Sequence, residues 1–319
     1  MPVMRNGEKI APQFFLGVCF ANSTVGVGSE FMMMYQAFSC SVIGASHAKS
    51  GKPCQDYSLH YADKNVVIAV VADGHGSAAH FRSDRGARIA CECAVKFIAA
   101  FAEKYGGNLG ESELPELARN IASEWDKRVA GDWEKDPPVG LSEEQAAGDS
   151  EEPEKSKNPK DILNPRDPPD SRNPREAYGS TLIAAGVSRS GWFGLQIGDG
   201  KCAVRYADGD FLQPIPWDEK CFLNVTTSLC DTDPGSEFRY YASRKIPAAL
   251  FIGTDGVDNS YPVHENEKHL NGLYSIIEDN FSKEGFKKGL MELCDFLPVL
   301  TQKGSGDDVS IAGIVRVNP

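Results

Sequence analysis

The chain has 319 residues, of which 41% are hydrophobic, so it is long enough to bury one large core or two ordinary ones. Its 45 acidic side chains outnumber 33 basic ones, which gives a formal net charge of −12. Because no cluster of Lys and Arg accompanies this acidic balance, the composition argues against nucleic acid as a partner.

The first 35 residues are expected to form a leader of uncertain structure. Its moderately apolar part, residues 10–28, is too short and too polar to span a bilayer, so no membrane anchor is predicted. A weak signal peptide is the alternative to an unstructured leader, but the valine before Cys19 and the lack of a small-residue cleavage site disfavour it. Three methionines at 32–34 offer another start, which an intact mass would test.

Two strands and two helices are predicted after the leader. Short segments rich in β-branched residues predict strands at 38–44 and 66–72. From Ser83 onward, apolar residues recur at four-residue spacing, which is typical of a helix with one buried face. A narrower stripe of the same kind runs through 117–129. We expect both stripes to pack against the core and to carry no chemistry.

Residues 131–177 differ in composition from the rest of the chain. They contain 8 of the 19 prolines, 13 acidic and 7 basic residues, and almost no large apolar side chains. Such a segment cannot bury enough apolar surface to offset the entropy lost on ordering. The composition predicts a disordered acidic insert between the second helix and the strand that begins near Tyr178.

Five strands and one helix are predicted after the insert. An apolar stripe at 286–297 predicts the helix, and YADGDF at 206–211 predicts a hairpin turn. The strands are expected at 180–187, 192–198, 202–207, 248–254 and 309–317. Since strands and helices do not alternate, the order favours an α+β fold with antiparallel sheets and helices outside them.

The nine cysteines are scattered through apolar segments. They form no CxxC pair and no His/Cys cluster at zinc spacing. Reduced, mostly buried thiols are therefore expected, which indicates a reducing compartment such as the cytoplasm.

Acidic residues recur where an apolar strand meets a glycine-rich or polar turn. In VVIAVVADGHGSAAHF, at 67–82, a strand that looks buried on both faces ends at an aspartate, and three other sites share this design, with Asp56, just before a strand, as a fifth candidate. Alone, each is an ordinary solvated turn. Paired strands could bring them to one edge, where clustered carboxylates repel unless a cation such as Mg²⁺ or Mn²⁺ lies among them. The residues are Asp56, Asp73, Asp199, Asp255 and the pair Asp307 and Asp308.

Five motifs resemble, in order and context, those of the type 2C metal-dependent protein serine/threonine phosphatases, in particular bacterial-like members. They are DGHG at 73–76, GST at 179–181, GDG at 198–200, TDG at 254–256 and DDVS at 307–310. The resemblance covers nearly the whole chain apart from the leader and the insert. It implies a four-layer α-β-β-α sandwich, with two antiparallel sheets flanked by helices, in a phosphatase domain at 36–319.

The resemblance also implies a metal site at one end of the sandwich. Asp73 would bridge two Mn²⁺ or Mg²⁺ ions, Gly74 would offer its carbonyl oxygen, and Asp255 and Asp307 would complete the protein ligands. Asp56 matches an acidic position that holds a metal-bound water.

A weaker third ion is implied as well, held in part by Asp199. The family's second carboxylate for that ion lies four residues after the later-strand aspartate, which here is Asn259. Asp258 stands one residue too early, so the occupancy of the third position is left open.

The expected chemistry is attack on phosphorus by a water that bridges the two metals. His75 could protonate the departing serine or threonine oxygen, or it could be a hydrogen-bonding residue that only orients a ligand. The acid role is slightly favoured.

The sequence departs from the family at the residue that grips the substrate phosphate. The usual arginine lies four residues before an E-D pair, but here the pair is Gln55 and Asp56 and the arginine position is Gly51. Lys52 is the leading substitute, with Lys49 and His47 as further candidates, and a solvated basic turn is the alternative for each.

The leading prediction is a monomeric enzyme that hydrolyses phosphoserine and phosphothreonine in proteins and opposes a serine/threonine kinase. The first alternative is a non-catalytic phosphoprotein-binding regulator with the same fold, which the missing arginine would favour and the intact acidic set disfavours. The second is a two-metal hydrolase of small phosphoesters or phosphodiesters.

Overall fold

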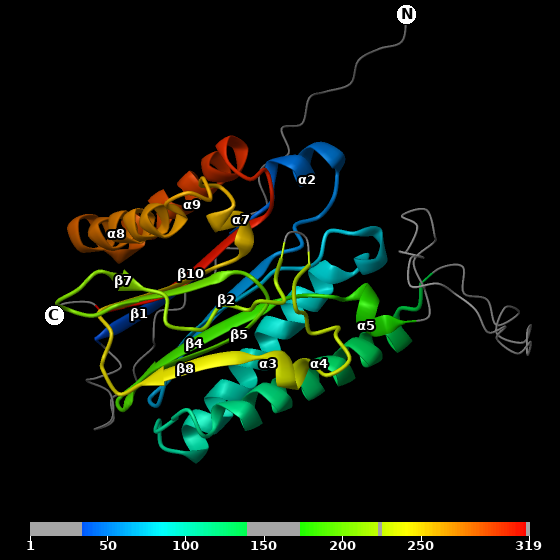
Figure 1. Cartoon of the computed structure of the whole chain (residues 1–319), viewed down its shortest axis with the longest axis horizontal. Helices are drawn as coiled ribbons and strands as arrows, with labels where there is room; N and C mark the ends of the chain where they lie inside the picture. The colour runs from blue at the N-terminus through cyan, green and yellow to red at the C-terminus, as the bar shows by residue number, and fades with distance from the viewer. Residues whose placement is uncertain (1–33, 139–172, 223–224, 317–319) are drawn as a thin grey trace, which may run out of the picture.

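Two antiparallel five-stranded sheets form the middle of the protein (Figure 1). The computed structural model describes residues 34–138, 173–222 and 225–316. The first sheet has the order β1 (Tyr35–Val42), β10 (Val309–Arg316), β9 (Ala249–Gly253), β6 (Lys201–Arg205) and β7 (Phe211–Leu212). The second has the order β2 (Tyr57–Ala62), β3 (Val67–Ala72), β4 (Leu182–Ser188), β5 (Gly191–Ile197) and β8 (Arg239–Ser243).

Two long helices cover the outer face of each sheet (Figure 1). On the first sheet they are α8 (Asn266–Glu284) and α9 (Phe286–Lys303), and on the second α3 (Ser83–Lys104) and α4 (Leu114–Lys135). The short helices are α2 (Ala45–Ser50), η1 (Ala78–His80), α5 (Pro174–Ala177), α6 (Pro234–Glu237) and α7 (Asp255–Asp258). The arrangement confirms the predicted four-layer α+β sandwich.

Strand β3 shows why the sequence before the first aspartate motif is apolar throughout. Val67, Ala69 and Val71 pack into the core between the two sheets. The alternate residues, Ile68 and Val70, pack into the core under α3 and α4. Because side chains alternate along a strand, covering both faces of β3 requires a continuous apolar run.

Helix α3 passes very close to the backbone of the segment before β4. A Cβ atom on Gly86 would lie 1.8 Å from the carbonyl oxygen of Tyr178, so no other residue fits there without a shift of the backbone. The indole nitrogen of Trp125 in α4 donates to the carbonyl oxygen of Gly86, over 3.0 Å. This contact fixes the start of α3 next to the segment that precedes β4.

Several elements differ from the prediction. Helix α8 was not predicted, because its residues include Asn, Ser and Gly, which have low helix propensity, and packing stabilises it instead. Strands β2, β7 and β8 were not predicted either; β2 and β8 lie at the edges of the second sheet, and their half-exposed residues give no apolar run. The hairpin turn at 206–211 is confirmed, since β6 pairs with β7 across it.

The predicted bounds of the insert are wrong at both ends. Helix α4 continues to Lys135, and α5 makes 174–177 helical, so 131–135 and 174–177 belong to the ordered fold. The central part of the insert, 139–172, and the leader up to residue 33 lie outside the described residues. Across the described ranges, no helix combines the length and the apolar character needed to cross a membrane.

Candidate active site

The turn after β3 is fixed by hydrogen bonds to the segment before β4. The backbone N–H of Thr181 donates to the carbonyl oxygen of Asp73 (2.8 Å), and the backbone N–H of Asp73 donates to Thr181 Oγ1 (3.1 Å). A Cβ atom on Gly74 would lie 2.6 Å from the carbonyl oxygens of both Gln55 and Ser83, so the chain passes there only as glycine. The Asp73 carboxyl group is therefore held at a fixed place at the end of the sheets.

Asp255 meets Asp73 at this place. It is the first residue of α7, one residue after β9, and the carboxyl groups of Asp73 and Asp255 are close enough to act on each other electrostatically. Burial raises the pKa of Asp73 well above its usual range, and the charges of Asp255 and Asp56 raise it further. Burial also raises the pKa of Asp255, to about 6. Two such carboxyls in contact need a proton or a cation between them.

Asp56 lies behind this pair and is nearly inaccessible. Its side chain is 5% exposed, and Thr254 Oγ1 donates to Asp56 Oδ2 over 2.7 Å. Burial raises the pKa of Asp56, and the neighbouring charge of Asp308 adds to the effect. Thr254 lies between β9 and Asp255, so one short segment positions carboxylates on both sides of the site.

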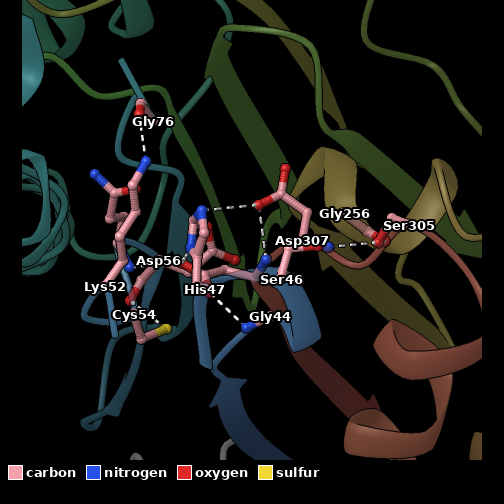
Figure 2. A network of polar contacts seen from close by, with 12 residues as sticks. Gly44, Ser46, His47, Lys52, Cys54, Asp56, Gly76, Gly256, Ser305 and Asp307 are labelled. Carbon is pink, nitrogen blue, oxygen red and sulfur yellow. Dashed lines mark hydrogen bonds and ion pairs between the residues drawn. The ribbon is translucent and has the colours of Figure 1, made fainter. Parts of the chain in front are cut away.

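The two adjacent aspartates before β10 have different environments. Asp308 is 3% exposed, and its carboxylate accepts hydrogen bonds from the backbone N–H groups of Gly44 (2.5 Å) and Gln55 (2.6 Å). Asp307 is 52% exposed on its side chain. His47 lies beside both, with Nδ1 3.0 Å from Asp308 Oδ2. Its Nε2 is 3.9 Å from Asp307 Oδ1 (Figure 2). Asp308 thus links distant parts of the chain, whereas the Asp307 carboxylate, whose Oδ1 accepts from the backbone N–H of Asp308 (2.8 Å), stays half-exposed and can still take a ligand.

Four of the predicted site residues are close enough to influence one another's pKa: Asp56, Asp73, Asp255 and Asp307. The charge of Asp307 acts on Asp73 and on Asp255, and Asp255 also acts on Asp56. The segments that carry these four residues are far apart in the sequence and meet at one end of the sandwich. Asp199, in the turn between β5 and β6, also acts on Asp255, and its pKa, raised mainly by burial, is lowered somewhat by the charges of Lys201 and Arg239.

His75, two residues after Asp73, is half-buried against Ser228 and His80. Its Nε2 lies 2.7 Å from Ser228 Oγ, and its ring centroid is 4.7 Å from that of His80. Burial, assisted by His80, lowers the pKa of His75 to about 4. The imidazole is therefore neutral at pH 7, which suits the hydrogen-bonding role that the sequence left as the alternative.

Lys52 contacts the turn that follows β3. Its ammonium donates to the carbonyl oxygen of Gly76 over 3.0 Å, and its side chain is exposed (Figure 2). Lys49, in α2, is exposed as well. Of the three basic candidates, Lys52 reaches the aspartate turn, and His47 is held by the aspartates of the DDVS motif.

Three residues that support the site were not predicted from the sequence. Gln55 donates from Nε2 to the carbonyl oxygen of His75 over 3.1 Å, which helps to fix the turn after β3. Thr254 and Thr181 hold Asp56 and Asp73. Both threonines lie inside motifs that the sequence showed, TDG and GST, so their position beside a glycine turn was the available signal.

The oxygen-rich site fits a hydrated divalent cation. In the part of the chain that the structure describes, no group of three or more His, Cys, Asp or Glu side chains is placed to hold a metal ion by itself. Mg²⁺ keeps several waters and takes few carboxylates, so a complete protein cage is not required. Asp73, Asp255 and Asp307 offer hard oxygen donors, and their mutual repulsion would be relieved by positive charge.

Comparison with known proteins points to one family. A sequence model of the family described as protein phosphatase 2C matches residues 43–293. A comparison with curated proteins found no significant match.

Three solved structures with a similar fold have low sequence identity. A serine/threonine phosphatase of S. agalactiae aligns with a TM-score of 0.53 and 13% identity over 89% of this chain and 100% of its own. A bacterial serine phosphatase aligns at 0.52 and 13% over 89% and 98% of the two chains. A C. elegans sex determining protein aligns at 0.52 and 15% over 89% and 65%. At these identities the likeness concerns the fold alone.

Proposed function

The chain belongs to the protein phosphatase 2C family, and from this premise we propose that it hydrolyses phosphoserine and phosphothreonine in proteins with two divalent metal ions. The pairing of Asp73 with Asp255 is the observation that carries the proposal. Two desolvated carboxyls held in contact by the fold lower the stability of the protein unless positive charge compensates them. Bound cations would compensate these two carboxylates, so the pair is expected in an enzyme that uses cations.

The metal-holding residues are Asp73, the carbonyl oxygen of Gly74, Asp255 and Asp307, with Mn²⁺ or Mg²⁺ as the ions. When bound, the ions lower the pKa of water and offset negative charge on the phosphoryl group. The exposed carboxylate of Asp307 supports this role better than that of Asp308, because both Asp308 oxygens accept hydrogen bonds from backbone N–H groups, whereas in Asp307 only Oδ1 does.

The other residues of the site position the reactants. Asp56, fixed by Thr254, accepts a hydrogen bond from water on the buried side. Lys52 is the phosphate-binding residue in place of the missing arginine, because its ammonium lies at the aspartate turn and is open to solvent. His75 orients substrate or water as a neutral hydrogen-bonding group; as a proton donor it would first have to take up a proton.

The partner of this site is a phosphorylated protein, and the opposing enzyme is a serine/threonine kinase. We expect the protein to act as a monomer in the cytoplasm. The described cysteines support a reducing compartment, since all eight are free and most are buried.

The experiment is Mn²⁺-dependent release of phosphate from a phosphothreonine peptide. We expect turnover by the wild-type protein, a loss of at least 100-fold in Asp73→Asn, and no change in the control Asp295→Asn, which alters an exposed carboxylate on α9. Binding of the phosphopeptide without turnover in the wild type would instead support the non-catalytic regulator. Turnover of small phosphoesters alone would support a different two-metal hydrolase.

A further inference from the structure

The imidazole of His47 lies between the two adjacent aspartates that precede β10. His47 is the third residue of α2, and its two ring nitrogens face different carboxylates (Figure 2). Nδ1 is 3.0 Å from Oδ2 of the buried Asp308, and Nε2 is 3.9 Å from Oδ1 of the half-exposed Asp307. The side chain of His47 is itself 15% exposed, so the ring borders the solvent-accessible part of the proposed metal site.

The backbone of α2 fixes His47 in this place. The backbone N–H of Ser46 donates to the carbonyl oxygen of Gly306 over 2.8 Å. A Cβ atom on Gly44, the residue before α2, would lie 2.4 Å from the carbonyl carbon of Asp307. Because the main chains meet this closely on both sides of the helix start, His47 cannot move away from Asp307 without a shift of the whole helix.

Asp308 forms a rigid support behind the ring. Both of its oxygens accept hydrogen bonds from backbone N–H groups, Oδ1 from Gly44 and Oδ2 from Gln55, and its side chain is 3% exposed. A fixed carboxylate beside one ring nitrogen is the usual support of a metal-binding histidine, because it sets which nitrogen carries the proton and makes the other a stronger donor.

The Nδ1 atom of His47 is buried and has no aligned hydrogen-bond partner among the described residues. Since Asp308 Oδ2 lies only 3.0 Å away, a small rotation of the ring would direct the Nδ1–H at this oxygen and satisfy both atoms. A neutral imidazole carries one proton, so Nε2 would then present its lone pair toward Asp307. A lone pair and a carboxylate oxygen that face each other repel unless positive charge lies between them.

The distance between Nε2 and Asp307 Oδ1 fits two ligands of one ion. At 3.9 Å the atoms are too far apart for a hydrogen bond. Two ligand atoms that each lie about 2.1 Å from an ion are separated by about 3 to 4.2 Å, depending on the angle at the ion. Asp307 Oδ1 already accepts from the backbone N–H of Asp308 over 2.8 Å and keeps a second lone pair for an ion.

We propose that His47 is a nitrogen ligand of the ion held by Asp307, and that it makes this position prefer a first-row transition metal such as Mn²⁺ over Mg²⁺. The inference rests on the proposed two-metal site. Mg²⁺ takes oxygen ligands and water, whereas transition metals also accept imidazole nitrogen. A ring that faces two carboxylates is better placed to bind a cation than the phosphate considered for it from the sequence.

The test measures metal binding without turnover. Pulsed electron paramagnetic resonance of the Mn²⁺-loaded protein detects nitrogen bonded to the ion, and calorimetry gives the affinities for Mn²⁺ and Mg²⁺. We expect a bound-nitrogen signal in the wild type and none in His47→Gln. In that variant the affinity for one Mn²⁺ ion should fall about 10-fold or more and that for Mg²⁺ by less than about 3-fold. The control His264→Gln, which changes an exposed histidine, should match the wild type.

The outcomes separate this inference from the proposed function. A wild type that binds Mn²⁺ without bound nitrogen, or a signal that persists in His47→Gln and in the second variant His47→Ala, would remove His47 as a ligand and leave the aspartate site intact. Equal losses of Mn²⁺ and Mg²⁺ affinity would overturn the selectivity. If the wild type binds Mn²⁺ no more tightly than Asp73→Asn, the two-metal site itself fails, and the inference fails with it.

Discussion

Asp73 and Asp255 are neighbouring carboxyl groups of the site that both resist being charged. Burial and neighbouring carboxylates raise the pKa of both. Above that pKa, each unit by which it is raised costs about 1.4 kcal/mol of folding stability. The protein therefore gives up stability at this site, a trade that is common where a fold serves chemistry.

Replacing Asp73 by asparagine should make the metal-free protein more stable. The amide can donate a hydrogen bond to Asp255 and removes one buried charge, so we expect a gain of about 1 kcal/mol or more at pH 7.5. Thermal unfolding in EDTA measures it, with Asp295→Asn as the matched exposed control. A melting temperature equal to or below that of the wild type would contradict the electrostatic account.

Lys52 should affect substrate binding more than the chemical step. Because its ammonium lies at the aspartate turn without holding any carboxylate, Lys52→Ala should raise KM for a phosphothreonine peptide several-fold and change kcat little. Lys49→Ala, an exposed lysine of α2, is the matched control and should leave both constants unchanged. Equal KM values for all three proteins would remove Lys52 from the site.

At the residue scale, local sequence revealed which aspartates end apolar strands, but not how adjacent aspartates divide their roles. Asp307 and Asp308 are chemically identical, and only their partners distinguish them. Asp308 is fixed by the N–H groups of Gly44 and Gln55, which lie more than 250 positions earlier in the chain. No local pattern carries that information.

Among the elements, α3 depends most on a close backbone contact. Gly86→Ala should destabilise the protein by about 3 kcal/mol or more, because the new Cβ atom would overlap the backbone of Tyr178. The matched control is Gly131→Ala in α4, where the added Cβ meets no atom within 4 Å. This change should stabilise the helix by up to about 1 kcal/mol. Urea unfolding compares the two, and similar effects would contradict the packing account.

Strand β2 carries a pH-sensitive link between the sheets. His60 is 5% exposed, its Nδ1 lies 2.9 Å from Ser39 Oγ in β1, and burial lowers its pKa to about 4. Below the unfolded value of about 6.5, the unfolded chain binds a proton that the folded protein does not, so stability is lost as pH falls from about 6.5 to 4.

The loss of stability caused by His60 can be measured as the difference between the wild type and a His60 variant. Between pH 7.5 and 5.0 the wild type should lose about 2 kcal/mol more than His60→Gln in urea unfolding. His75, whose pKa is lowered in the same direction, is present in both proteins and cancels. Parallel pH profiles for the two proteins would show that His60 does not titrate in this way.

At the element scale, the sequence predicted the helices and strands that have an amphipathic pattern or a continuous apolar run. It did not predict the elements whose residues are half-exposed. The stripes of α3, α4 and α9 and the run in β3 follow from burial of one or both faces. Helix α8 and strands β2 and β8 depend on neighbours supplied by other parts of the chain. Their sequences alone give little preference for either state.

For the whole molecule, metal binding and proton binding should compete. Asp255 has a pKa of about 6 in the metal-free fold against about 3.9 when unfolded, so the metal-free protein gains stability below pH 6 and loses it as pH rises through 6. Divalent ions need the deprotonated carboxylate.

The stabilisation by Mn²⁺ should therefore depend on pH. At 100 times the dissociation constant, one ion adds about 2.7 kcal/mol to stability. We expect a larger rise in melting temperature over EDTA at pH 7.5 than at pH 5.0, and almost none in Asp73→Asn at either pH. An equal rise at both pH values would indicate ions bound away from the aspartates.

The position of β10 determines when the site can come into existence. This strand follows every other described strand in the sequence, yet it lies between β1 and β9 in its sheet, and it begins directly after Asp307 and Asp308. On the ribosome, β1 emerges first and has no described neighbour in its own sheet except β10. The proposed metal site, which includes Asp307, is therefore incomplete in a nascent chain until this strand has left the exit tunnel.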